Sequence, residues 1–161
     1  MFSIFDIFNC RFTPTSEVDL CGHATLASAH ALYDTRRVAS AATPINFFNK
    51  NGDTLSAKKR RDGMIELDFP STPPVAVTLT ETELDGILKG LTIMTEDIIF
   101  TGKTVYDFFI EIDASKFAGL QTINFESLSK LDSRGVIITC RGTTAKHDFT
   151  SRWFGPRYEN N

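Results

Sequence analysis

An alanine-rich segment dominates the pattern of hydrophobic and polar positions along the chain. From Ala24 to Tyr33 there is no Gly or Pro, which favours a helix. Apolar residues recur at helical spacing on two stripes, one through Leu26, Ala29, His30 and Tyr33 and one through Ala24, Ala27 and Ala31. Because polar interruptions are few and small, the pattern predicts a helix that is apolar on nearly all sides and lies in the protein interior.

Segments that alternate with period two predict half-buried strands on both sides of the middle of the chain. Residues 64–69 alternate between polar and apolar positions, and residues 106–112 do the same. Asn51-Gly52 and Asp62-Gly63 predict hairpin turns, and Gly102-Lys103 predicts a further turn. Other strands are expected over residues 45–48, 98–100, 136–140 and 149–154, while residues 2–8 suit either a strand or an apolar lead helix.

Two further helices are expected outside this strand-rich part. Thr80 and Glu83 have the spacing of a capping box before an apolar helical stripe, and residues 125–131 suit a short helix. The order of elements therefore predicts an α+β protein with a mostly antiparallel curved sheet, one buried helix and two peripheral helices. With 161 residues, one domain over residues 1–161 is expected.

Composition narrows the classes of function. A net charge of −3 argues against a general nucleic-acid-binding protein. Cys10, Cys21 and Cys140 are odd in number and widely spaced, which indicates free thiols in a reducing compartment and neither a disulfide framework nor a zinc site. Residues 1–9 are apolar but lack the basic start of a signal peptide and are too short to span a membrane. We expect a cytoplasmic protein with no metal, no cofactor, no nucleic-acid partner and no membrane partner.

The start of the predicted central helix is the strongest candidate for chemistry. Its first backbone N–H groups, at Gly22-His23-Ala24, suit a carboxylate or phosphate. His23 either exchanges a proton there or only caps the turn. Cys21 is either a helix-terminal thiolate or a small buried thiol, and the second is favoured. Glu17 either reaches this site or pairs with Arg11 or backbone, and again the second is favoured.

Other candidates have plain structural interpretations. The basic run Lys58–Arg61 suits a solvated hairpin tip better than a nuclear signal or a nucleic-acid contact, because Asp62-Gly63 follows it. His30 suits a core histidine, and Cys10 and Cys140 suit core positions. His147-Asp148 at the last predicted strand could orient another group, but no partner nucleophile for the pair is evident.

Two motifs together resemble one known family. Residues 12–25 read Phe-Thr-Pro-x-x-Glu-x-x-x-Cys-Gly-His-Ala-Thr, and residues 148–156 read Asp-Phe-Thr-Ser-Arg-Trp-Phe-Gly-Pro. Both resemble the PhzF-like isomerases, which share the diaminopimelate-epimerase fold. The resemblance implies a strongly curved, mostly antiparallel sheet wrapped around a central helix. Residues 1–161 would then correspond to the first half of a two-lobed protein, and the active site would lie between the lobes.

For function, the resemblance implies a cofactor-independent isomerase that moves a proton on a small carboxylate-bearing substrate. His23 takes the family's catalytic histidine position, and Cys21, Gly22 and Ala24 surround the substrate-binding backbone. The family's Asn-Leu-Ser-Glu and Asp-Pro-Val-x-Gly-Ser motifs do not occur in this sequence. We therefore expect an incomplete, inactive half. The alternative is a truncated, non-catalytic paralogue that acts as a binding or assembly module, with a homodimer as one form.

Overall fold

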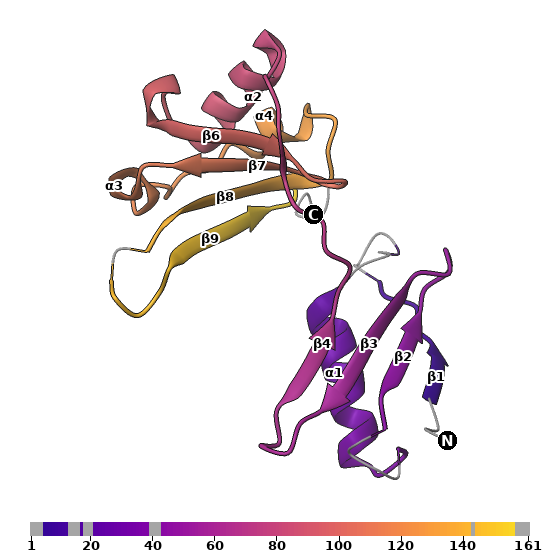
Figure 1. Ribbon diagram of the computed structural model, residues 1–161. Helices are drawn as coiled ribbons and strands as arrows, with labels where there is room; N and C mark the ends of the chain where they lie inside the picture. The colour runs from indigo at the N-terminus through magenta and orange to yellow at the C-terminus, as the bar shows by residue number, and fades with distance from the viewer. Residues whose placement is uncertain (1–4, 13–16, 18–20, 39–42, 143, 157–161) are drawn as a thin grey trace. The chain divides into compact units, whose positions relative to one another are not determined.

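The computed structural model describes residues 5–12, 17, 21–38, 43–142 and 144–156. The chain divides into two compact units, Met1–Ser71 and Thr72–Asn161, and each is described by itself (Figure 1). Among the described residues, the first unit combines a mixed β-sheet with one helix and the second combines a mixed β-sheet with several, which confirms the α+β class. The sequence also predicts that Thr13-Pro14-Thr15-Ser16 breaks regular structure, but these residues lie outside the described ones. One domain over residues 1–161 stays a prediction.

The first unit contains a four-stranded sheet. Its strands are β1 (Phe5–Phe8), β2 (Ile45–Phe48), β3 (Thr54–Lys59) and β4 (Ile65–Asp68), in the spatial order β1-β2-β3-β4. The β1–β2 pair is parallel and the other two pairs are antiparallel. Gly52 and Gly63 take φ values of +84° and +85° at the two hairpin turns, which confirms both turn predictions. Of the two alternatives for residues 2–8, the strand is the one observed, over Phe5–Phe8.

Helix α1 (Gly22–Asp34) packs one face against β3 and β4. Ala29 and Tyr33 on this face join a core with residues of β2 and β3, namely Ile45, Phe47 and Ala57. The Tyr33 hydroxyl donates to the carbonyl oxygens of Thr43 at 2.8 Å and of Ala57 at 3.3 Å. These bonds fix the end of α1 to the sheet, and burial raises the pKa of Tyr33.

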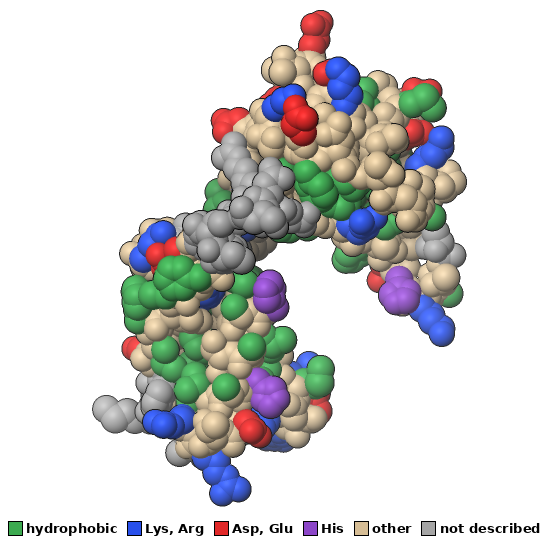
Figure 2. All heavy atoms as spheres, turned by 180° about the vertical axis from the view of Figure 1, so that it is seen from behind, with side chains coloured by type: hydrophobic (Ala, Val, Ile, Leu, Met, Phe, Trp, Pro, Cys, Tyr) green, Lys and Arg blue, Asp and Glu red, His purple; other side chains and the backbone are tan. Residues whose placement is uncertain are grey.

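The opposite flank of α1 is exposed. Its exposed residues follow the spacing of one helix face: His23, Leu26, Ala27, His30, Ala31 and Asp34. Figure 2 shows histidine side chains among hydrophobic ones on this side of the first unit. In this unit α1 is therefore not buried on nearly all sides, because the sheet packs against only one face of the helix. The prediction that His30 is a core histidine is wrong for the same reason.

The second unit contains a five-stranded sheet in the order β5-β6-β7-β8-β9. The strands are β5 (Val75–Ala76), β6 (Ile98–Lys103), β7 (Asp107–Ile112), β8 (Gly135–Arg141) and β9 (Phe149–Phe154). Only the β7–β8 pair among them is parallel. The turn prediction for Gly102-Lys103 is wrong, because both residues belong to β6. A Cβ on Gly102 would lie 2.8 Å from the Phe100 ring, so the glycine here permits close packing.

Helices cover one face of this second sheet. Helix α2 (Glu81–Leu91) begins with the expected capping box, in which the Thr80 hydroxyl accepts from the Glu83 N–H and the Glu83 carboxylate accepts from the Thr80 N–H. Helices α3 (Ala114–Phe117) and α4 (Phe125–Ser129) and the 3-10 turn η1 (Thr95–Asp97) complete the described helical elements. The core lies between α2, α4 and alternate residues of β7 and β8: Ile87, Leu91, Phe108, Ile110, Ile112, Leu128, Val136 and Ile138.

Candidate functional site

The N-terminus of α1 presents a set of backbone donors. Cys21 is the N-cap residue, with an extended backbone at φ −144° and ψ 98°, and its side chain makes no capping hydrogen bond. The first intrahelical donor is the Thr25 N–H, which reaches the Cys21 carbonyl at 3.1 Å. The N–H groups of Gly22, His23 and Ala24 precede it, at the positive end of the helix dipole. These donors suit a carboxylate or phosphate oxygen.

Gly22 is held against an aromatic ring. A Cβ built on this residue would lie 2.8 Å from Cζ of Phe69, a separation that Cβ atoms essentially never show. Phe69 directly follows β4, which lies against α1. The missing side chain at position 22 therefore has a packing reason in addition to its expected role of leaving the first-turn N–H groups accessible.

A buried arginine supports the first turn from below. Arg11 is 3% exposed, and its Nε donates to the Thr25 hydroxyl oxygen at 3.1 Å. That hydroxyl in turn donates to the Cys21 carbonyl at 2.9 Å. The chain of contacts places a guanidinium beneath the helix start, where its charge favours a bound anion. Sequence reasoning considered Arg11 only as a partner for Glu17 and missed this role.

His23 and Cys21 lie together at the same end. The Cys21 sulfur is 3.4 Å from Nε2 and 3.9 Å from Nδ1 of His23. His23 is exposed and Cys21 is half-buried. The structure thus brings the four sequence-predicted site residues, Cys21, Gly22, His23 and Ala24, onto one helix start, where an imidazole, a thiol and the backbone donors face the same surroundings.

The remaining charged candidates form contacts of their own. Glu17 forms an ion pair with Lys50 at 3.4 Å, a partner from the β2–β3 turn that the local sequence does not suggest. The basic run 58–61 lies at a hairpin, where Arg60 pairs with Asp62 at 3.0 Å, so the interpretation as a solvated hairpin tip is confirmed. His147 is exposed in the β8–β9 connection.

The cysteines divide between surface and core. Cys140 is buried, and this burial raises the pKa of its thiol. Cys10 is exposed, so its prediction as a core residue is wrong.

Within the described ranges, no three His, Cys, Asp or Glu side chains cluster as metal ligands would. None of the helices in the described part of the chain is long and apolar enough to cross a bilayer.

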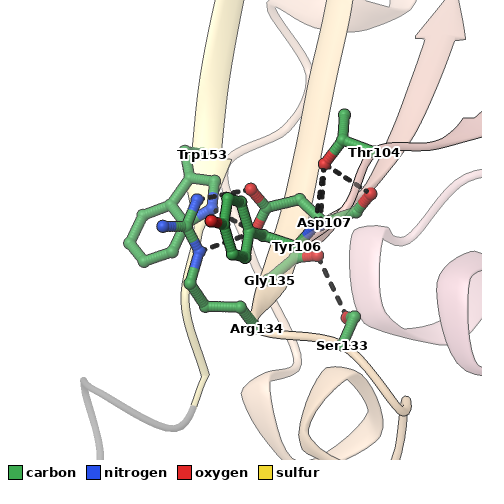
Figure 3. Close-up of polar contacts among 7 residues, drawn as sticks. All are labelled: Thr104, Tyr106, Asp107, Ser133, Arg134, Gly135 and Trp153. Carbon is green, nitrogen blue, oxygen red and sulfur yellow. Dashed lines mark hydrogen bonds and ion pairs between the residues drawn. The ribbon is translucent and has the colours of Figure 1, made fainter. Parts of the chain in front are cut away.

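A second polar cluster, which sequence reasoning did not find, lies in the unit 72–161 (Figure 3). Asp107 is 4% exposed and accepts from Arg134 Nε at 3.1 Å, from Arg134 Nη2, and from the Trp153 indole N–H at 3.1 Å. The Arg134 guanidinium also lies over the rings of Tyr106 and Trp153, at 5.1 and 5.5 Å from their centroids.

The cluster borders a surface hollow of about 430 Å³ lined by residues 103–107 and 132–134. Two positively charged side chains that line the hollow already form ion pairs, Arg134 with Asp107 and Lys103 with Glu83 at 2.7 Å. Because these charges are paired with protein carboxylates, the geometry fits a structural network that joins β7, β8 and β9 better than a ligand site.

Known proteins resemble this chain over most of its length. The family model "Phenazine biosynthesis-like protein" (PhzC-PhzF) matches residues 8–160. An uncharacterized isomerase of Halalkalibacterium halodurans is 43% identical over 145 residues, covering 90% of this chain and 51% of that protein. Phenazine biosynthesis-like domain-containing protein 1 of Mus musculus is 34% identical over 158 residues, covering 90% of this chain and 52% of that protein.

Solved structures agree with the sequence relatives. The crystal structure of a PhzF-family phenazine biosynthesis protein from Enterococcus faecalis superposes with a TM-score of 0.71 at 31% identity, covering 93% of this chain and 53% of that one. The chain thus spans about half the length of the relatives it matches. The motif at the start of α1, the two sheets and these matches agree, and the chain belongs to the phenazine biosynthesis-like (PhzF) family of isomerases.

Proposed function

We propose that the start of α1 is the anion-binding part of the active site of a PhzF-like isomerase. The proposed reaction moves a proton on a small carboxylate-bearing substrate without a cofactor. The observation that carries the proposal is the first turn at Cys21, Gly22 and Ala24, where the N-cap side chain makes no capping hydrogen bond and the His23 imidazole lies beside the backbone donors. The names of the relatives support the reaction class.

Each group has a proposed role. The substrate carboxylate accepts hydrogen bonds from the first-turn N–H groups, and the charge of Arg11 beneath the turn favours it. His23 exchanges a proton with the bound substrate, because an imidazole can act as a general acid or base and this one is exposed to the same space. In the complete site, further sheet and chain wrap the exposed flank of α1, as the resemblance implies. The free thiols support a cytoplasmic location.

The 161 residues alone are proposed to bind the carboxylate without turnover. A positioned acid or base contributes about 10²–10⁴ in rate, and the family's Asn-Leu-Ser-Glu and Asp-Pro-Val-x-Gly-Ser motifs are not in this sequence. His23 would then act without the carboxylate of the Asn-Leu-Ser-Glu motif, which the resemblance gives as the group that shuttles the proton. Binding and catalysis are therefore separable in this chain.

The test uses two measurements on the same protein. Amide chemical shifts are followed by NMR while acetate, lactate and benzoate are added, and deuterium incorporation into each acid is followed in D₂O. We expect saturable shifts at the amides of Gly22, His23 and Ala24, and no incorporation above the rate without protein. Arg11→Met should weaken binding, whereas Arg60→Met, which removes an exposed arginine from the same unit, should not.

The two halves of the proposal fail separately. No shift at the three amides would refute the anion site. Deuterium incorporation would instead refute the claim that the chain alone is inactive. If incorporation occurred, its survival in His23→Ala would also exclude His23 from the proton transfer.

A second candidate function is an assembly module that pairs with another copy of the chain. The exposed apolar residues on the α1 flank, with Leu26 40% exposed at its centre, favour it. A helix of 13 residues offers a face of roughly 20 by 10 Å, or about 200 Å² per partner, against about 800 Å² per partner in a stable interface. The expected dimer is therefore weak, and the site proposal is preferred.

Sedimentation velocity across a concentration series tests the dimer. We expect association that Leu26→Lys abolishes and Met64→Lys preserves, because Met64 is an equally apolar exposed residue of the same unit at the β3–β4 turn. A monomer at every concentration would contradict the assembly role.

A further inference from the structure

Basic side chains gather at one end of the first unit. Helix α1 ends there, because the Tyr33 hydroxyl reaches the carbonyl oxygen of Ala57 near the end of β3, whereas the start of the helix at Gly22 lies against Phe69, which follows β4. The end of α1 and the β3–β4 hairpin are therefore neighbours (Figure 1). Together they form a basic end with six positive side chains: Arg36, Arg37, Lys58, Lys59, Arg60 and Arg61.

This basic end has an excess of positive charge in a chain whose net charge is −3. The acidic residues of the same two segments are Asp34, Asp62 and Glu66, so they balance only half of the positive charge. Within the described part of the chain, Arg60 is the one member of the six that forms an ion pair, with Asp62 at 3.0 Å. Lys59 is half-buried and the other five are exposed, and Figure 2 shows Lys and Arg side chains that protrude from this end of the unit.

Holding these charges together costs stability. Like charges at neighbouring positions repel one another. Arg36 also has a φ of 55°, in the left-handed region where glycine is the usual residue after a helix. The negative end of the helix dipole accounts for basic residues at Arg36 and Arg37, but not for four consecutive ones in the adjacent hairpin. A conformation and a charge cluster held at such a cost point to a bound polyanion.

Met64 indicates which polyanion fits. It follows Gly63 at the hairpin turn and is 65% exposed, so an apolar side chain stands among the basic ones. Nucleic acids bind to basic surfaces that also offer aromatic rings for stacking, and Tyr33, the aromatic residue at the end of α1, is buried. A bilayer with anionic headgroups accepts both the positive charges and an apolar side chain just beneath them. We propose that the basic end of the first unit binds the surface of membranes that contain anionic phospholipids.

The proposal departs from the expectation of no membrane partner. That expectation considered segments that span a bilayer, and binding at a surface requires none. A negative net charge does not oppose it either, because at about 0.1 M salt charges more than about 10 Å from the surface are largely screened. The basic end and the first-turn N–H groups of α1 lie at opposite ends of the helix, so the two proposals are independent.

The experiment measures the fraction of the intact chain that floats with lipid vesicles at about 0.1 M salt. One set of vesicles contains phosphatidylcholine alone, and the other contains phosphatidylcholine with phosphatidylserine. We expect binding to the second set only. Raising the salt to about 1 M should release the protein, because the Debye length then falls to about 3 Å.

Two double variants locate the binding surface. Lys58→Gln with Arg61→Gln should weaken binding about 25-fold, because each basic residue near an anionic surface contributes roughly fivefold. The ion pair of the hairpin stays intact in this variant. The matched control is Lys89→Gln with Lys130→Gln, which removes the same charge from exposed positions of the second unit and should change binding by less than about twofold.

Met64→Ser tests the choice of a bilayer over a nucleic acid. It should weaken binding to the anionic vesicles by about threefold or more, because an apolar side chain no longer leaves water. A labelled RNA oligonucleotide, at the same concentration of phosphate groups, should bind more weakly than the vesicles when its fluorescence anisotropy is measured.

Three results would overturn the inference. Equal or absent binding with the two vesicle sets would exclude recognition of anionic headgroups. Equal losses in the two double variants would show that net charge decides binding and the basic end does not. Tighter binding to the RNA than to the anionic vesicles would make this surface a nucleic-acid site. None of these results depends on carboxylate binding, so the isomerase proposal is tested separately.

Discussion

Replacing Asp107 by Asn is expected to destabilise the unit 72–161 strongly. The carboxylate is 4% exposed and accepts from two guanidinium nitrogens of Arg134 and from the indole of Trp153 (Figure 3). An Asn side chain keeps the shape and one acceptor oxygen. Its amide nitrogen, however, is a donor that would face the donors of Arg134.

The magnitude follows from the burial of both partners. Breaking a fully buried ion pair costs about 3–5 kcal/mol. The Arg134 side chain is 29% exposed, so water can recover part of its lost bonding, and we expect a cost of about 2–3 kcal/mol. With a denaturant slope of about 1–2 kcal/mol/M for a unit of this size, the urea midpoint should fall by about 1–3 M.

The assay can use the only tryptophan in the chain, Trp153, which belongs to the cluster itself. Its fluorescence during urea unfolding reports on the unit 72–161. Asp132→Asn is the matched control, since it makes the same charge change at an exposed position beside the same hollow and should cost less than about 0.5 kcal/mol.

A double-mutant cycle with Arg134→Met separates the pair from its surroundings. We expect the sum of the unfolding free energies lost in the two single variants to exceed the loss in the double variant by more than about 1 kcal/mol, because the residues share one network. Strict additivity, or equal midpoints for Asp107→Asn and Asp132→Asn, would refute the reasoning that the pair supports the unit.

Three other predictions concern single contacts. Gly90→Ala should cost about 1–3 kcal/mol more in unfolding free energy than Gly86→Ala, because the added Cβ would lie 2.2 Å from buried Leu128 at position 90 but 3.0 Å from Leu131 at position 86; equal midpoints in urea would contradict this. The hydrogen bond from Lys103 is the largest cause that lowers the pKa of Glu83 from 4.5 to about 2. The contribution of the ionised Glu83 to folding stability is therefore present above pH 4.5 and is lost as the pH falls toward 2. NMR titration should therefore show a higher Glu83 pKa in Lys103→Met and no change in Lys89→Met, the control for an exposed pair on the same helix. Gly22→Ala should destabilise the first unit, and less so in a Phe69→Ala background, as circular dichroism during urea unfolding can measure.

Locally encoded features were predictable from the sequence. The capping box of Thr80 and Glu83 depends on residues three apart, and the hairpins at Gly52 and Gly63 depend on the φ values that glycine adopts without strain. The alternating strand at residues 65–68 was equally visible, because its period reflects one buried face. In each case the physical cause lies within a few residues of the signal.

Features that depend on strand register were not predictable in this way. Asp107 and Arg134 are 27 positions apart, and Asp107 and Trp153 are 46 apart, so their contact requires β7, β8 and β9 to be aligned first. Gly102 looked like a turn residue, but its role is set by the Phe100 ring beside it. The pairing of Glu17 with Lys50 likewise depends on the placement of the β2–β3 turn.

The exposed flank of α1 bears on how the family motif should be interpreted. Helix composition predicted an interior helix, apolar on nearly all sides, yet the sheet of the first unit covers only the face with Ala29 and Tyr33. The motif residues do not depend on that burial, since Arg11 holds Thr25, and Thr25 holds the Cys21 carbonyl. Gly22 is fixed in the same way, by the Phe69 ring. The helix start is therefore built by the motif and its own unit. The proposed anion site does not require the rest of the helix to be buried, and the kinship rests on the matches over residues 8–160.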